Sequence, residues 1–186
     1  MPRPSRSGAP RCFRGCFKRR RTRGAVVRAT HPLSLDDEVK GKVSARMARS
    51  VLFDQDHHTP SYWVVLHESL LIDAILPPPE MAEQLQRIVE LAEGRRIITQ
   101  IVLRKCSPHP FMLGSAKIMT FADAPPLFYT ESLHSGDTID DPALVGEYRR
   151  SYDLLRAVAL SPGASLAMIK AAAEDYRNGK QPDRLE

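Results

Sequence analysis

The sequence has few cysteines and no long apolar run, and both shortages narrow the class of protein. Only three cysteines occur in 186 residues, at Cys12, Cys16 and Cys106, which is too few and too odd in number for a disulfide framework. No run of about 18 apolar residues is present to form a membrane-spanning helix. No secretory-signal pattern opens the chain either. We therefore expect a cytoplasmic protein that makes no contact with a membrane.

The sequence signatures of common catalytic and cofactor sites are also missing. The ten glycines are spread thinly and form neither a phosphate-binding loop nor a dinucleotide fingerprint. Neither GxSxG nor HExxH occurs. Cys12 and Cys16 have the spacing of a zinc pair, but no second Cys/His pair lies near them in the sequence. We expect no metal, no cofactor and no enzymatic activity.

Positive charge is concentrated at the N-terminus. Residues 1–30 hold ten Lys and Arg and no acidic residue, whereas residues 31–186 hold 17 basic and 22 acidic residues, a net charge of −5. The first 30 residues are also rich in Pro, Ser and Gly, so we expect them to form a disordered tail. Five of its basic residues would bind nucleic acid without sequence specificity and in a salt-dependent way: Lys18, Arg19, Arg20, Arg21 and Arg23.

The rest of the chain alternates between helix and strand patterns. Apolar residues recur every four positions over residues 34–51 and on one face of residues 80–93, which predicts two amphipathic helices. Residues 62–66 are rich in β-branched and aromatic side chains and predict a buried strand. Residues 97–103 predict another strand, and a short helix is expected between them at residues 68–76. Residues 116–121 and 127–131 predict an antiparallel hairpin.

Two capped helices are predicted to follow the hairpin. Asp140 or Asp141 would cap the first, which opens with Pro142, and Ser161 would cap the second. This order favours an α+β domain over residues 31–179, with a roughly four-stranded mixed sheet covered by helices. We expect the polar end, residues 180–186, to fray.

Four residues are candidates for a ligand or partner site. Glu68 follows one predicted strand and Glu131 ends another, so the two carboxylates would meet at one end of the sheet if those strands were neighbours. Residues 104–114 form a predicted loop that holds His109 and Phe111. This loop and the ends of the strands would line a pocket if the domain senses a small molecule. Each residue also has a purely structural interpretation, as a capping carboxylate or a loop side chain.

An ordered set of segments resembles a known family. The segments are RATHPLSLDDEVKGKVSARMARSVLFD (residues 28–54), YWVVLHESLL (62–71), MAEQLQRIVELA (81–92), the strands IITQIVL, KIMTF and LFYTES, and YRRSYDLLRAVALSPGASLAMI (148–169). The most specific features are Glu68, Gln84-Leu85 and Ala159-Leu160-Ser161-Pro162 with Ser165. The set, over about residues 25–179, resembles the C-terminal domain of WhiJ-type, toxin–antitoxin-like transcriptional regulators of actinobacteria.

This resemblance implies a domain that acts in transcription regulation through a partner or a ligand. Family members carry a DNA-binding helix-turn-helix domain of the XRE type at the N-terminus, which this sequence does not show, so we expect no specific DNA binding by this chain. The expected partner is a small protein encoded by a neighbouring gene or a full-length relative, with a homodimer as the other arrangement. A small-molecule sensor is the alternative function, and an enzyme is the least favoured.

Overall fold

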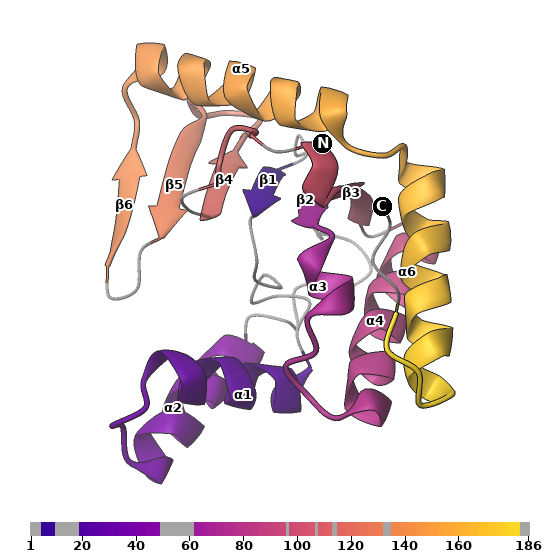
Figure 1. Cartoon of the computed structure of the whole chain (residues 1–186). Coiled ribbons are helices and arrows are strands. Elements are labelled where there is room, and N and C mark those ends of the chain that lie inside the picture. The colour runs from indigo at the N-terminus through magenta and orange to yellow at the C-terminus, as the bar shows by residue number, and fades with distance from the viewer. Residues whose placement is uncertain are drawn as a thin grey trace.

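The chain forms a mixed sheet with helices on both faces (Figure 1). The computed structural model describes residues 5–9, 19–48, 62–95, 97–106, 108–112, 115–131 and 135–182. Its strands are β1 (Ser5–Ala9), β2 (Tyr62–His67), β3 (Ile97–Val102), β4 (Ser115–Met119), β5 (Leu127–Glu131) and β6 (Gly136–Ile139). Its α-helices are α1 (Arg20–Thr30), α2 (Asp36–Ala48), α3 (Ser69–Ile72), α4 (Pro78–Glu93), α5 (Pro142–Val158) and α6 (Pro162–Arg177). A 3-10 turn, η3 (Arg104–Cys106), follows β3.

The sheet confirms the predicted α+β class and contains two strands that were not expected. Within the described residues, six strands lie in the order β3-β2-β1-β4-β5-β6. β1 and β3 run parallel to β2, whereas β4, β5 and β6 form an antiparallel series that joins β1 through β4. The predicted hairpin of β4 and β5 is confirmed. The additional strands are β1, at the centre of the sheet, and β6, at its edge.

Alternating side chains of β2 separate two hydrophobic cores. Val64 and Leu66 pack in a cluster with apolar residues of α4 and α6, and Val65 packs in a second cluster with residues of α5. All three side chains are almost fully buried. The two faces of this strand are therefore both covered, as the apolar run predicted. α4 and α6 cover one face of the sheet, and α5 crosses the other (Figure 1).

The junction between α5 and α6 closes the free edge of β3. Leu160 donates its backbone N–H to the Ile101 carbonyl (2.8 Å), and the Ile101 N–H donates to Ser165 Oγ (2.9 Å). Asp141 and Ser161 cap α5 and α6 as predicted, by accepting from the N–H groups of Leu144 and Ala164. Leu160 and Ser165 thus pair the outward backbone groups of Ile101 in β3, which is an edge strand among the described residues.

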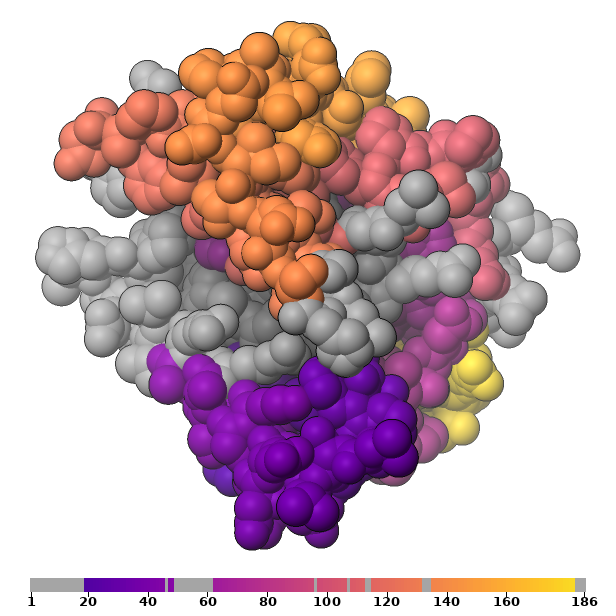
Figure 2. Space-filling view, turned by 90° about the vertical axis from the view of Figure 1, so that its left-hand side faces the viewer, coloured from indigo at the N-terminus to yellow at the C-terminus, as the bar shows by residue number. Residues whose placement is uncertain are grey.

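The expectation of a disordered tail is wrong for residues 5–9 and 20–30. β1 pairs through its backbone with β2 on one side and β4 on the other, and α1 buries Thr22, Arg23 and Val27. Backbone pairing needs no apolar side chain, so composition alone does not reveal such a strand. α1 and α2 lie at the opposite end of the molecule from α5 (Figures 1 and 2).

The C-terminal end also differs from its prediction. Gln181 donates its side-chain N–H to the Ile72 carbonyl (3.0 Å), and Pro182 is buried. Residues 180–182 are therefore held against α3, whereas residues 183–186 lie outside the described residues.

In the part of the chain that is described, no single helix is long and apolar enough to cross a membrane. α5 and α6 meet the length and hydropathy criterion only when they are taken together, as a pair bent by 66°.

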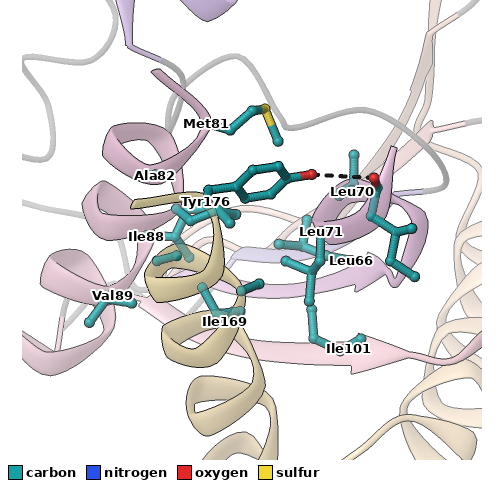
Figure 3. Packing of buried hydrophobic residues seen from close by; sticks show 14 of the residues in the cluster. Leu66, Leu70, Leu71, Met81, Ala82, Ile88, Val89, Ile101, Ile169 and Tyr176 are labelled. Atoms are coloured by element: carbon teal, nitrogen blue, oxygen red, sulfur yellow. Dashed lines mark hydrogen bonds between the residues drawn. The ribbon is translucent and has the colours of Figure 1, made fainter. Parts of the chain in front are cut away.

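Tyr176 of α6 lies at the centre of the larger core. Its side chain is 1% exposed, and its ring lies between Met81 of α4 and the leucines of α3 (Figure 3). The hydroxyl donates to the Ile72 carbonyl (3.2 Å). Burial, and secondarily the negative charge of Asp73, raise the pKa of Tyr176 above its ordinary value of 10.0. The folded state therefore retains this proton at a pH where the unfolded chain loses it.

This pKa shift predicts an alkaline loss of stability that a single substitution removes. Below about pH 10 the tyrosine is protonated in both states, and its contribution is constant. As pH rises above 10, only the unfolded state ionises readily, so the free energy of unfolding falls. Tyr176→Phe should show a shallower decline between pH 9.5 and 11 in urea titrations. A decline identical to that of the wild type would contradict the assignment.

Candidate functional site

A pocket lies on the sheet face that α5 covers. Its volume is about 680 Å³. Four elements contribute its walls: the segment after η3, the adjoining parts of β4 and β5, and α5. The residues that line it are His109, Phe111, Met112, Ser115, Ala116, Phe128, Thr130 and Tyr148. Two of the four predicted site residues, His109 and Phe111, therefore share one pocket.

Stacked aromatic rings form one wall of this pocket. Phe128 of β5 is 2% exposed and stacks against Tyr148 of α5, with 3.6 Å between ring centroids and 5° between the ring planes. The Phe111 ring lies beside this pair, with 6.4 Å between its centroid and that of Phe128. Rings from a loop, a strand and a helix are thus brought together, although they are far apart in the sequence.

Phe111 has a backbone conformation that is unusual for a bulky residue. Its φ is 68°, in the left-handed region that favours glycine. Such conformations cost free energy and occur often where a binding or catalytic site fixes the local geometry. The loop therefore directs this aromatic side chain toward the pocket at a cost in local strain.

His109 has a defined proton position. Its Nδ1 lies 2.6 Å from the Pro110 carbonyl oxygen. A carbonyl oxygen can only accept, so Nδ1 donates in this contact and Nε2 is left for a bound molecule. The His67 ring lies nearby, with 6.1 Å between the two ring centroids. In its uncharged form, His109 can accept one hydrogen bond from a bound molecule through Nε2.

Glu68 lies outside the pocket and has a structural role. Its side chain is 1% exposed, and its Oε2 accepts a hydrogen bond from the backbone N–H of Arg104 (2.8 Å). The Glu68 N–H donates in turn to the Val102 carbonyl (2.9 Å). Glu68 therefore joins the end of β2 to the start of η3, and so fixes where the loop that carries His109 leaves the sheet.

Glu131 does not meet Glu68. Both lie at the same end of the sheet, but β1 and β4 lie between their strands. Three strand spacings of about 4.8 Å separate them by roughly 14 Å. Glu131 is exposed and pairs through its backbone with Ser115 and Gly136. The condition for a pair of carboxylates at the end of the sheet is therefore not met, because β2 and β5 are not neighbours.

The structure does not assemble a metal site within the described residues, where no group of three His, Cys, Asp or Glu side chains could hold an ion. Cys12, Cys16 and Lys18 lie outside the described residues.

Cys106 lies at the end of η3, and its Sγ donates to the Val158 carbonyl of α5 (3.4 Å). This contact places the C-terminal end of α5 beside the segment that carries His109.

Two of the predicted basic residues form ion pairs with α4, although their side chains stay exposed. Arg21 forms an ion pair with Glu80, and Arg19 with Glu83 (3.6 Å). Arg23 is fully buried, which corrects its assignment as a nucleic-acid contact. Arg20 is exposed. The described part of this segment is therefore a helix with exposed arginines beside α4, and not an extended arm.

Gln84 is a key residue whose role sequence reasoning missed. It is fully buried in α4, and its Oε1 accepts from the Arg19 backbone N–H (2.8 Å) and from Thr22 Oγ1 (2.7 Å). It therefore caps the N-terminus of α1 from another helix, where Arg19 supplies no capping side chain of its own. The available signal was a glutamine three residues after Met81, on the apolar face of its helix.

Comparison with known proteins places the chain in a family. The family model described as "Domain of unknown function (DUF5753)" matches residues 5–171, and so includes β1 and α1 and begins before the predicted boundary at residue 31. No curated protein and no solved structure matches the chain. Because the match covers most of the 186 residues, the chain belongs to the DUF5753 family.

Proposed function

We propose that this chain is a regulatory, non-enzymatic domain that acts by binding a protein partner. The resemblance to WhiJ-type, antitoxin-like transcriptional regulators of actinobacteria supports a role in transcription regulation in the cytoplasm. The partner is a small protein encoded by a neighbouring gene. A full-length relative and a second copy of the chain are the other arrangements that the experiment below distinguishes.

A row of exposed apolar residues on α5 is the observation that carries this proposal. Leu144, Leu154 and Val158 are 44%, 62% and 47% exposed. At about 100° per residue, the three side chains fall within an arc of roughly 80° on one side of the helix. The buried residues of α5, Tyr152 among them, point toward the sheet instead. The exposed Glu147 falls within the same arc, so this face combines apolar side chains with a charge, and a partner helix or groove could pack on it.

The arrangement of acidic and basic groups supports a binding role over catalysis or DNA reading. Glu68 and Glu131 lie too far apart to work as an acid–base pair on one substrate. Ion pairs with α4 occupy Arg19 and Arg21, and Arg23 is buried. Nucleic-acid contact is therefore proposed to be non-specific and to weaken as salt rises, because it depends on counterion release.

The partner surface can be tested with one charge substitution and a matched control. Leu154→Asp should weaken capture of the purified neighbouring-gene protein by about tenfold or more, because the charge would be buried at the interface. Leu35→Asp, at a residue that is 72% exposed on the segment before α2, should leave capture unchanged. Light scattering of the chain alone and with a full-length relative tests the other arrangements. Equal effects of the two variants would contradict the proposal.

The pocket beneath α5 favours a small-molecule sensor as a second function. Its volume lies within the range of about 300 to 1,000 Å³ that is typical of ligand sites. Tyr148 lines the pocket from the same helix that carries the exposed apolar row. A ligand that contacts Tyr148 would thus touch the element proposed to bind the partner.

A further inference from the structure

We infer that the pocket beneath α5 binds an uncharged, planar aromatic compound. The inference rests on the second proposed function and names the class of ligand. It depends on three properties of the described pocket walls: the lack of Asp, Glu, Lys and Arg among their residues, the aromatic rings and the available hydrogen-bonding groups.

The described walls hold no side chain with a permanent charge. Among the described residues that line the pocket, none is Asp, Glu, Lys or Arg. An ionised group moved from water into such a pocket would lose its hydration without gaining an opposite charge. The cost of this desolvation selects against carboxylates, phosphates and ammonium groups, and favours a neutral molecule.

The partly exposed rings of Phe111 and Tyr148 favour an aromatic ligand. Phe128 and Tyr148 are nearly parallel, and Phe111 adds a third ring at 27° to Phe128. Aromatic rings interact favourably with other aromatic rings in offset-stacked and edge-to-face arrangements. Met112 adds a flexible thioether side chain that is 48% exposed at the pocket. Methionine adapts to irregular surfaces and makes favourable contacts with aromatic rings.

A few neutral polar groups remain to orient the ligand. Nε2 of His109 is an acceptor, because Nδ1 donates to the Pro110 carbonyl. Ser115 and Tyr148 add hydroxyl groups to the lining. An aromatic molecule with one N–H or O–H donor therefore matches both the apolar walls and the acceptor that the histidine provides.

Two matched fluorescent probes test the ligand class. N-phenyl-1-naphthylamine has three aromatic rings, one N–H donor and no charge, and 8-anilino-1-naphthalenesulfonate differs from it by one sulfonate. Each probe is titrated into the full chain. The dissociation constant of the neutral probe should be at least about tenfold smaller than that of the anionic probe, a difference of about 1.4 kcal/mol in binding free energy. Equal or tighter binding of the sulfonate would overturn the inference.

A pair of tryptophan substitutions tests the location. Met112→Trp places a larger ring at the pocket and should weaken binding of the neutral probe by about tenfold or more by filling the site. Ile75→Trp is the control, because Ile75 is also 48% exposed and does not line the pocket. Both positions are at the surface, so both variants should fold, and circular dichroism checks this.

The outcomes separate this inference from the partner proposal. Loss of probe binding in Met112→Trp alone supports the pocket. Equal binding by both variants, or loss only in Leu154→Asp, would place the probe elsewhere and overturn the inference. Capture of the neighbouring-gene protein is measured without any probe, so a failed pocket leaves the result for the α5 surface intact.

Discussion

Replacing Tyr152 with alanine is expected to lower the free energy of unfolding by about 3 to 5 kcal/mol, as truncation of large aromatic core residues does. Tyr152 is 1% exposed and packs in the cluster that joins α5 to the sheet. Its hydroxyl donates to the backbone carbonyl of Trp63 in β2 (2.9 Å). The loss is a large part of the roughly 5 to 15 kcal/mol that stabilises a domain. Urea unfolding followed by circular dichroism measures it.

Tyr152→Phe is the matched control for this prediction. It keeps the ring and removes only the hydrogen bond, so it should cost about 0.5 to 1.5 kcal/mol. The difference between the two variants is the contribution of the ring. The average substitution lowers the free energy of unfolding by about 1 kcal/mol. If Tyr152→Ala lowered it by no more than this, α5 would not be packed on the sheet as described.

Trp63 shows why packing on β2 was only partly predictable. The alternation of the strand places Trp63 and Val65 on the same face, and Val65 is completely buried there. Trp63 itself is half-buried, and the guanidinium group of Arg156 lies over its ring, 3.4 Å from the ring centroid. The indole N–H donates to Gln100 Oε1 (2.9 Å). Periodicity identifies the face of a strand, but not which helix residue ends up above it.

Local signals account for the elements that were predicted correctly. Asp141 and Ser161 each precede a proline at the first helical position, and both cap the helices that follow. These signals lie within four residues of the structure that they specify, so the sequence alone is sufficient. β6 gives no such signal, because it is four residues long, mostly polar and exposed.

Long-range pairing accounts for what was missed. The order of the strands places β1 between β2 and β4, and this order decides that Glu68 and Glu131 lie apart. The same order brings Phe128 and His109 to one pocket, with Tyr148 added by α5. A loop with His109 and Phe111 could be named from the sequence as a candidate. Its aromatic partners could not, because no local pattern specifies which strand lies under which helix.

Gln84→Ala is expected to release α1 from α4 and to lower the free energy of unfolding by about 1 to 3 kcal/mol, the cost of leaving buried polar groups unpaired. The Gln84 side chain accepts hydrogen bonds from the Arg19 N–H and the Thr22 hydroxyl. Thr22 is fully buried, so water does not readily replace the missing acceptor. The N-terminus of α1 would lose the group that caps it.

The ion pairs beside Gln84 are not expected to hold α1 in its place. Arg21 is 76% exposed in its pair with Glu80, and Glu83 is 63% exposed in its pair with Arg19. Exposed pairs of this kind contribute about 0 to 1 kcal/mol and weaken with salt. Raising the salt concentration should therefore leave α1 docked in the wild type, whereas Gln84→Ala should release it at any salt concentration.

Hydrogen exchange of the α1 amides measures this release directly. In Gln84→Ala the amides of residues 23–30 should exchange much faster than in the wild type, while those of α6 stay protected because their core is intact. Gln86→Ala is the control on the same helix, because Gln86 is only partly buried and its loss should change stability by less than about 0.5 kcal/mol. Unchanged protection of α1 in Gln84→Ala would show that the buried Val27, rather than the cap, holds the helix in place.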